Sequence, residues 1–334
     1  MKKILLTPVV LFAIWSAYWV IGKNTLMGAF AEAQTDLRED GIELSAANIK
    51  VKGYPLGYQA ALNDVSVKSD NSQYSAELIN IKASALKPTV WTLTADKPVH
   101  VKMRGNDGQP YDFILAGEEM RVELGSSVTG KLKSVHAVMR GLKAVAAPNG
   151  LAPPVIGIET GELSISPSAA PLQEGMSTHF DFSGVRLGHK AGGDLQRAFG
   201  PLIPRVHGTG LAAGLASLEA DDVAKWQTNG AITVPDFALD WGKTSFLGEV
   251  DLDLSATPTS GENGVANGAA TLGVTDANAL IQAFVEAGML TQGQALAGSF
   301  LLMAAPVDAK GNTVLTFPVQ DNALTLFGQT LHKF

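Results

Sequence analysis

Through most of the chain, apolar and polar residues alternate one by one, which is the pattern of β-strands with one buried and one hydrated face. The clearest segments are residues 79–84, 99–104, 179–183 and 250–255. Strands of a buried parallel sheet are typically continuous apolar runs, so this alternation favours antiparallel pairing. We therefore expect a mainly β protein of the α+β class, built on a large twisted antiparallel sheet.

A pair of helices is expected near the C-terminus. Asp276 is a suitable N-cap for a first helix, and Gly288 is a suitable residue to end it. A second helix is predicted by apolar residues at helical spacing, namely Leu296, Phe300 and Met303. The strand pattern then returns at residues 314–317 and 324–327.

Two further segments have helical spacing. The first is residues 195–202, where Pro201 and Pro204 limit the helix, and the second is residues 211–226. Between them, Gly208–Gly214 has the spacing G-x-G-x-x-x-G, which differs from the G-x-G-x-x-G of a dinucleotide-binding loop. Because no strand is expected before these glycines, they indicate a flexible loop or the entry to a helix rather than a nucleotide site.

An uncharged apolar run opens the chain at residues 4–21 and follows Lys2 and Lys3. As a helix it would be about 27 Å long, close to the roughly 30 Å hydrocarbon thickness of a bilayer. The preceding lysines favour a cytoplasmic N-terminus and an exported remainder. The predicted parts are a cytoplasmic tip at 1–3, a transmembrane anchor at 4–21, a helical stalk at 22–40 and a β-rich domain at 41–334.

A cleaved signal peptide is the rival interpretation of the same region, because Ala29-Phe30-Ala31 is an A-x-A triplet. The apolar run is longer than the roughly 7–15 residues usual in signal peptides, which favours the uncleaved anchor. Further along, residues 144–154 are rich in alanine and proline. Since the strand pattern is the same on both sides, we expect a loop there, with a domain boundary as the alternative.

Composition excludes several classes of function. The net charge is −7 with no block of lysine or arginine, which argues against binding nucleic acid or an electrostatic grip on anionic lipid. The chain has no cysteine, so disulfides, thiolate nucleophiles and iron–sulfur clusters are excluded. We expect no cofactor, and nothing in the sequence indicates the oligomeric state.

Two sets of side chains are of types that carry chemistry. The first set, a candidate metal site, comprises His179, Asp181, His189 and His207. The second, candidate carboxylates for glycoside hydrolysis, comprises Asp240, Asp251 and Asp253. Neither set has a recognised ligand spacing or catalytic motif, and alternation places most of these residues on hydrated strand faces. We predict no catalytic or metal site; a periplasmic hydrolase is the third-ranked interpretation.

The apolar strand faces are the more informative feature. A long amphipathic sheet must cover its apolar face with helices, a second sheet or a ligand. If a lipid is that ligand, the candidate lipid-facing residues are Val99, Val101, Phe180, Phe182, Val250 and Leu252. The same residues fit an ordinary core. The leading hypothesis is a non-enzymatic protein that accommodates acyl chains, and the alternative is a scaffold for other proteins.

Several short motifs resemble domain-of-unknown-function family 2125, a family of bacterial envelope proteins. They are the Trp-rich segment 15–19, the Gly-aromatic-Pro segment 53–58, Leu239-Asp240-Trp241-Gly242 with the strand at 248–253, and the C-terminal elements around 287–290, 317–319 and 324–328. Asn322 stands where the family pattern has a turn glycine, but asparagine tolerates the left-handed backbone.

The resemblance covers nearly the whole chain and implies a single-pass protein of the bacterial inner membrane with a periplasmic β-rich domain. It also implies a distant relationship to AsmA-type envelope proteins, which are associated with lipid handling. The partners implied are inner-membrane lipid and other envelope proteins. No catalytic residue comes with the resemblance.

Overall fold

The computed structural model describes residues 28, 31, 34–35, 37–39, 41–53, 57–84, 86–105, 108–127, 131–148, 150–168, 174–188, 193–218, 220–255, 265–326 and 329–333. The predicted anchor at 4–21 lies outside this part. Among the described residues, no helix is long and apolar enough to cross a membrane. The described residues between 28 and 39 are helical.

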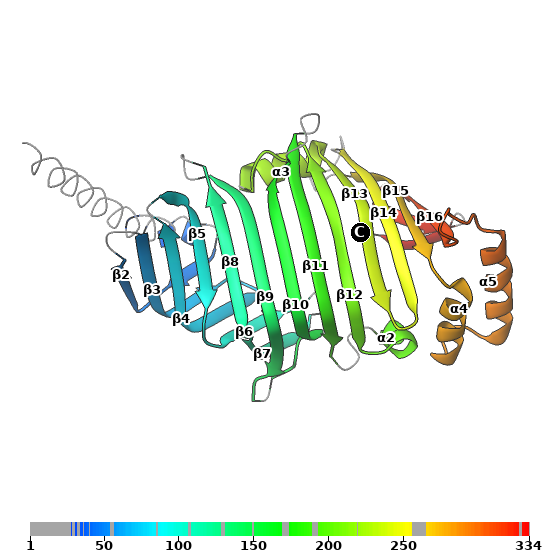
Figure 1. The fold of residues 1–334 in the computed structure, drawn as a ribbon, viewed down its shortest axis with the longest axis horizontal. Coiled ribbons are helices and arrows are strands. Elements are labelled where there is room, and N and C mark those ends of the chain that lie inside the picture. The colour runs from blue at the N-terminus through cyan, green and yellow to red at the C-terminus, as the bar shows by residue number, and fades with distance from the viewer. Residues whose placement is uncertain are drawn as a thin grey trace, which may run out of the picture. The chain divides into compact units, whose positions relative to one another are not determined.

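The chain divides into two compact units, one made of Met1–Val128 with Lys143–Pro153 and the other of Thr129–Leu142 with Pro154–Phe334. The strands of the first unit are β1 Glu43–Ser45, β2 Asn48–Lys52, β3 Gly57–Lys68, β4 Ser72–Ser84, β5 Lys87–Ala95, β6 Val99–Arg104, β7 Pro110–Ala116, β8 Glu119–Ser126 and the end of β9 Leu132–Ala146. All the pairs these strands form within the unit are antiparallel (Figure 1).

The sheet of the first unit branches at β4. One half of this strand pairs with β5, which pairs with β8, and the other half pairs with β6, which leads through β7 to β9. The apolar residues are Ala76 and Leu78 toward the half that pairs with β6, and Ile79 and Ile81 in the half that pairs with β5. Because successive side chains of a strand point to opposite sides, the apolar residues change sides at the branch. Each branch therefore has an apolar face of its own.

The second unit contains the strands β10 Val155–Pro167, β11 Gly175–Leu187, β12 Leu202–Ala213, β13 Ala231–Trp241, β14 Thr244–Ser255, β15 Val265–Val274, β16 Thr313–Gln320, β17 Ala323–Leu326 and β18 Gln329–Lys333. Each pairs antiparallel with the next. The helices are α2 Gly193–Phe199, α3 Ala220–Asn229, α4 Ala277–Glu286 and α5 Gln292–Ala304 (Figure 1). The predicted mainly β, antiparallel fold with C-terminal helices is confirmed.

Local signals in the sequence are confirmed at the C-terminal helices. The carboxylate of Asp276 accepts a hydrogen bond from the Ala279 amide at 2.8 Å and caps α4, and Gly288 has a φ of +72° just beyond it. Thr291 and Gln294 form a capping box at the start of α5. Asn322 has a φ of +60°, so it adopts the left-handed turn conformation expected of it.

The predicted helix at 211–226 is wrong in its position, because β12 extends to Ala213 and α3 begins only at Ala220. The expected glycine loop is wrong as well, since Gly208 and Gly210 lie within β12. This strand is paired on both sides, with β11 and with β13, so cross-strand hydrogen bonds override the local preference.

Proline is tolerated in this central strand at a local irregularity. In β12, the residues on either side of Pro204 pair with β11, whereas Pro204 itself faces Gly184, which has a φ of +59° and has no partner in the register. A proline cannot donate to a ladder, and the β11–β12 register continues without a shift past this unpaired position, so no donor is needed from Pro204.

The buried core of the second unit lies where α2 and α4 meet the strands. Phe199 of α2 contacts the rings of Trp241 at 5.2 Å, Phe246 at 5.8 Å and Phe284 at 5.7 Å between centroids. The Trp241 indole N–H donates to the carbonyl oxygen of Gly200 at 2.9 Å, which ties the end of α2 to β13. The helices therefore cover this end of the strands.

Candidate functional site

Cross-strand register places one row of residues across the sheet of the second unit. Residues directly opposite in neighbouring antiparallel strands point to the same side of a sheet. Phe180 of β11 is opposite Gly208 of β12, which is opposite Phe237 of β13. Continued in both directions, this apolar row comprises Leu163, Phe180, Gly208, Phe237, Gly248, Leu272 and Leu315.

The other candidate residues of the second unit lie on the same side. Phe182 is two residues from Phe180 in β11, and Val250 and Leu252 follow Gly248 in β14 at even spacing. A bulge at Pro235 in β13 lets Val234 pair with Val250 while Phe237 pairs with Gly248. We call the apolar row together with Phe182, Val206, Ile232, Val234, Val250 and Leu252 the apolar face.

Aromatic rings lean over glycines on this apolar face. A Cβ atom built on Gly208 would be 2.8 Å from Cζ of Phe180, and one on Gly161 would be 2.7 Å from Cδ1 of Phe182. The ring centroids of Phe180 and Phe182 are 6.3 Å apart, and those of Phe180 and Phe237 are 6.5 Å apart. The rings thus lie along the sheet, and they occupy the space that the missing side chains leave.

Helices cover the apolar face at one end of the strands. The core cluster of Phe199, Trp241, Val274 and Leu280 reaches Leu239, Phe246 and Leu272. Phe180, Phe182 and Phe237 are only half-buried and belong to neither cluster of buried apolar residues in the described part of the chain. Figure 1 shows α2 and α3 at opposite ends of these strands, with the middle of the strands between them.

Val99 and Val101 are placed differently from the other four candidates, because they lie in the first unit. Val101 is 4% exposed and forms a buried cluster with Phe113 and Ala144, against which Val99 packs. The structure thus brings Phe180, Phe182, Val250 and Leu252 together on one face and leaves Val99 and Val101 in a separate core.

The opposite side of the second unit's sheet is polar. The Arg205 guanidinium donates two hydrogen bonds to Asp181, from Nε at 3.1 Å and from Nη2 at 2.7 Å. This hydrogen bonding, then the charges of Arg205, His207 and His179, lowers the pKa of Asp181 against the raising effect of burial. Nδ1 of His207 is buried without a hydrogen-bond partner. His136 and Glu162 form a further pair at 3.0 Å.

The two sets of chemistry-bearing residues lie on this polar side or outside the described chain. His189 is outside the described residues, and no group of three or more metal-ligating side chains occurs among those that are described. Asp240 accepts a hydrogen bond from the Ser245 hydroxyl at 2.5 Å, and Asp251 accepts one from Thr233 at 3.3 Å. Hydrogen bonds to neighbouring hydroxyl groups are what is expected of carboxylates on a hydrated strand face, so neither residue needs a catalytic explanation.

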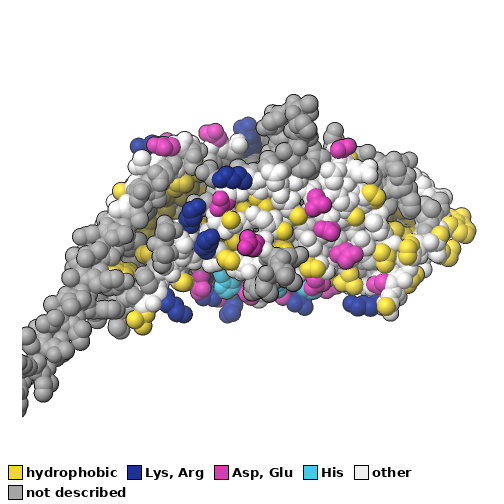
Figure 2. Space-filling model, turned by 90° about the horizontal axis from the view of Figure 1, so that it is seen from above, with side chains coloured by type: hydrophobic (Ala, Val, Ile, Leu, Met, Phe, Trp, Pro, Cys, Tyr) yellow, Lys and Arg dark blue, Asp and Glu magenta, His cyan; other side chains and the backbone are white. Residues whose placement is uncertain are grey.

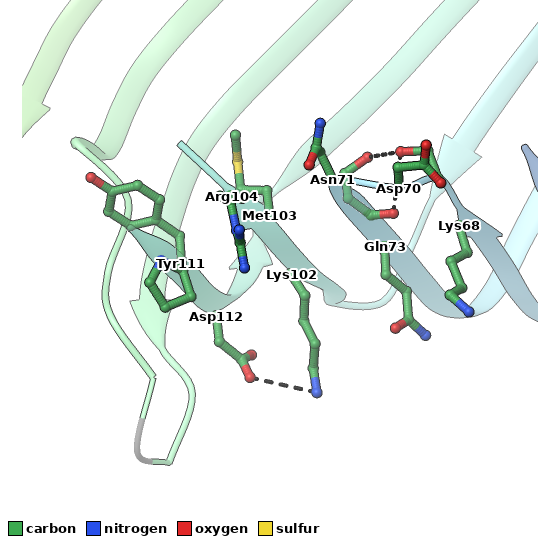
Figure 3. Close-up of a pocket in the computed structure, with 12 residues that line it drawn as sticks. Lys68, Asp70, Asn71, Gln73, Lys102, Met103, Arg104, Tyr111 and Asp112 are labelled. Atoms are coloured by element: carbon green, nitrogen blue, oxygen red, sulfur yellow. Dashed lines mark hydrogen bonds and ion pairs between the residues drawn. The ribbon is translucent and has the colours of Figure 1, made fainter. Parts of the chain in front are cut away.

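The first unit has an open polar pocket of about 440 Å³, formed by the β3–β4 turn, β6 and β7 (Figure 3). Asp112 lies between Nε2 of His100, at 2.5 Å, and Nζ of Lys102, at 3.6 Å. The His100 hydrogen bond is the main cause that lowers the pKa of Asp112. Sequence reasoning missed this cluster, since His100 and Lys102 have the alternation of any hydrated strand and Asp112 comes from another strand.

Ser75 adds a third residue type to the cluster, because it is directly opposite His100. Serine, histidine and aspartate are the residues of a hydrolase triad, and such a triad needs N–H donors for an oxyanion. Here β4 is paired at Ser75 on both edges, with Ser66 and with His100, so its backbone donors belong to the sheet. The cluster therefore gives no support to hydrolysis.

Comparison with known proteins yields one family. Residues 19–323 match the model of the family described as "Uncharacterized protein conserved in bacteria (DUF2125)". No curated protein and no solved structure matches the chain.

Proposed function

We propose that this chain, which belongs to the DUF2125 family of uncharacterized proteins conserved in bacteria, holds lipid acyl chains against the apolar face of its second unit. The observation that carries the proposal is the apolar row, which continues across seven neighbouring strands without a charged side chain. At about 4.8 Å between strands the row is roughly 29 Å long. One acyl chain reaches across half of a bilayer's hydrocarbon thickness, about 15 Å, so a single chain would cover only part of the row.

An acyl chain fits the apolar face better than a peptide does. The strands that carry Phe180, Phe237 and Val250 are paired on both edges, so they have no free backbone groups to add a peptide strand. An acyl chain needs no hydrogen bonds and would be held by removal of apolar area from water, at about 25 cal/mol per Å². The mechanism is passive and non-enzymatic.

The cellular setting is part of the same proposal. An anchor at residues 4–21 would hold the domain beside the inner membrane, on its periplasmic side, where phospholipid is the nearest source of acyl chains. A distant relationship to AsmA-type envelope proteins would agree with this role in lipid handling.

Photocrosslinking of the full-length chain tests the proposal. The protein is reconstituted in vesicles containing a phospholipid with a photoactivatable acyl chain, irradiated and digested, and the adducts are mapped by mass spectrometry. We expect adducts on peptides with residues 180–182, 232–237 and 250–252. Val250→Gln should lower their yield, whereas Asp251→Asn, the adjacent position on the opposite side of β14, should not. Equal labelling of both sides, or no labelling of these peptides, would disprove the proposal.

A second candidate is an interaction scaffold, which the polar side of the same sheet favours. Its half-exposed charge pairs, Asp181 with Arg205 and His136 with Glu162, could be joined by a partner protein's charges. This candidate predicts protein crosslinks from that side and no acyl adducts on the apolar face. The photocrosslinking experiment therefore separates the two.

A further inference from the structure

Helix α5 exposes an apolar stripe in the second unit. Leu296, Phe300 and Met303 are spaced at i, i+4 and i+7 and are 62%, 61% and 72% exposed. Val307, just beyond the helix, is 62% exposed. Figure 2 shows hydrophobic side chains gathered at the right-hand end of the view, the end at which Figure 1 places α5. We call Leu296, Phe300, Met303 and Val307 the α5 stripe.

The stripe lies in a segment without charge. From Ala287 to Val307 the sequence has no Asp, Glu, Lys or Arg, and Glu286 and Asp308 bound it on either side. An exposed helix of a domain surrounded by water normally carries charged residues on its outer face. In α5 the outward positions are apolar and the remaining polar residues, such as Gln292 and Gln294, are neutral.

The helix is fixed in place independently of any ligand. The capping box of Thr291 and Gln294 starts it, and Gly298 is close enough to α4 that a Cβ there would be 3.7 Å from Cδ1 of Ile281. Leu280 and Ile281 of α4 are buried. The pair α4 and α5 therefore presents the α5 stripe as a preformed surface.

The area of the stripe decides between two occupants. Four side chains at these exposures offer about 100 Å² each, roughly 400 Å² together, whereas a stable protein interface buries about 800 Å² per partner. Protein interfaces also have a polar rim with hydrogen bonds, often with arginine. The stripe is thus too small and too uniformly uncharged for a stable contact between two copies of the chain.

We propose that the α5 stripe inserts into the surface of a lipid bilayer. A helix that lies in the membrane surface buries its apolar face shallowly at the boundary between headgroups and acyl chains, and its binding strength scales with the apolar area buried. Since the segment from Ala287 to Val307 has no lysine or arginine, and Lys310 beyond it is offset by Asp308 and Glu286, the contact needs no anionic lipid and depends little on salt. This contact is separate from the apolar face of the sheet and does not depend on acyl binding there.

Site-specific labelling of the full-length protein tests the insertion. Because the chain has no cysteine, single variants such as Phe300→Cys and Met303→Cys can each carry one environment-sensitive fluorophore. The labelled protein is reconstituted in phosphatidylcholine vesicles that contain lipid with a nitroxide on its acyl chain. We expect several-fold quenching at both positions. Glu249→Cys, on the polar side of β14, is the control and should stay unquenched.

Each other outcome contradicts the proposal. Full accessibility of the Phe300→Cys label to aqueous iodide shows that the stripe stays in water. Protection that grows with the protein-to-lipid ratio, without acyl-chain quenching, shows contact with a second copy instead. A Leu296→Asp substitution in the Met303→Cys variant should abolish quenching, while circular dichroism stays unchanged because Leu296 is mostly exposed.

Discussion

The ring of Phe180 in β11 lies over Gly208, its direct partner in β12. A Cβ atom on Gly208 would be 2.8 Å from Phe180 Cζ and 2.8 Å from the carbonyl oxygen of Asp236. Glycine is therefore required at position 208 because the Phe180 ring and the β13 backbone approach it closely. Its backbone conformation is not the reason, since its φ is not in the left-handed region.

Gly208→Ala should consequently destabilise the second unit. The added methyl group collides with a backbone atom that cannot move freely, and overpacking of this kind costs about 1–3 kcal/mol. Urea unfolding followed by circular dichroism measures the effect. Gly210→Ala is the matched control, because the nearest atom to a Cβ at this position would be 3.6 Å away. This substitution should stabilise the strand by up to about 1 kcal/mol. Equal effects of the two substitutions would show that the contact with Phe180 is unimportant.

A larger side chain at Gly210 should block acyl binding without unfolding the protein. Gly210 is two residues from Gly208 in β12 and lies on the same side, with room for a Cβ. Gly210→Leu is expected to lower acyl photolabelling of β11, β13 and β14 several-fold. Thr209→Val changes the opposite side of the strand and should leave the labelling unchanged. Normal labelling of Gly210→Leu would show that the lipid does not pass over position 210.

Asp181 should contribute to stability in a pH-dependent way. Its pKa is lowered in the folded protein, first by the Arg205 hydrogen bonds, so its contribution is present above the unfolded value of about 4 and is lost as pH falls through the lower folded value. Because both side chains are at least a third exposed, we expect Asp181→Asn to cost only about 0.2–1 kcal/mol at pH 7. Melting temperatures of wild type and variant, measured from pH 7 to pH 2, should begin to converge below about pH 4 and meet only once the pH is below the lowered folded value. A gap that persists at pH 2 would assign the effect to something other than this carboxylate's charge.

Phe199 should be among the most costly side chains to remove. It is 8% exposed and contacts three aromatic rings, so Phe199→Ala is expected to cost about 3–5 kcal/mol. Phe300→Ala provides a control of identical chemistry at a 61% exposed position, with an expected change below about 0.5 kcal/mol in lipid-free buffer. Denaturant unfolding compares them, and similar losses would contradict the assignment of Phe199 to the core.

The sequence predicted those features of the fold that are encoded locally. One-by-one alternation identifies the strands because successive side chains of a strand point to opposite sides. Asp276 and Gly288 mark the limits of α4 because each acts on groups only a few residues away. The Asp276 side chain accepts from an amide of the first turn, and the Gly288 backbone adopts the left-handed conformation that ends the helix. Asn322 likewise adopts its turn conformation from its own residue type.

The sequence by itself thus determined the strand class, the C-terminal helices and the apolar character of alternate residues. Only the tertiary structure decided that 208–213 is strand, that Phe180 and Val250 share a face while Val101 lies in another unit's core, and that Asp112 meets His100. The physical reason is that cross-strand register and bulges join residues far apart in the chain, and neither is encoded in the spacing of neighbours.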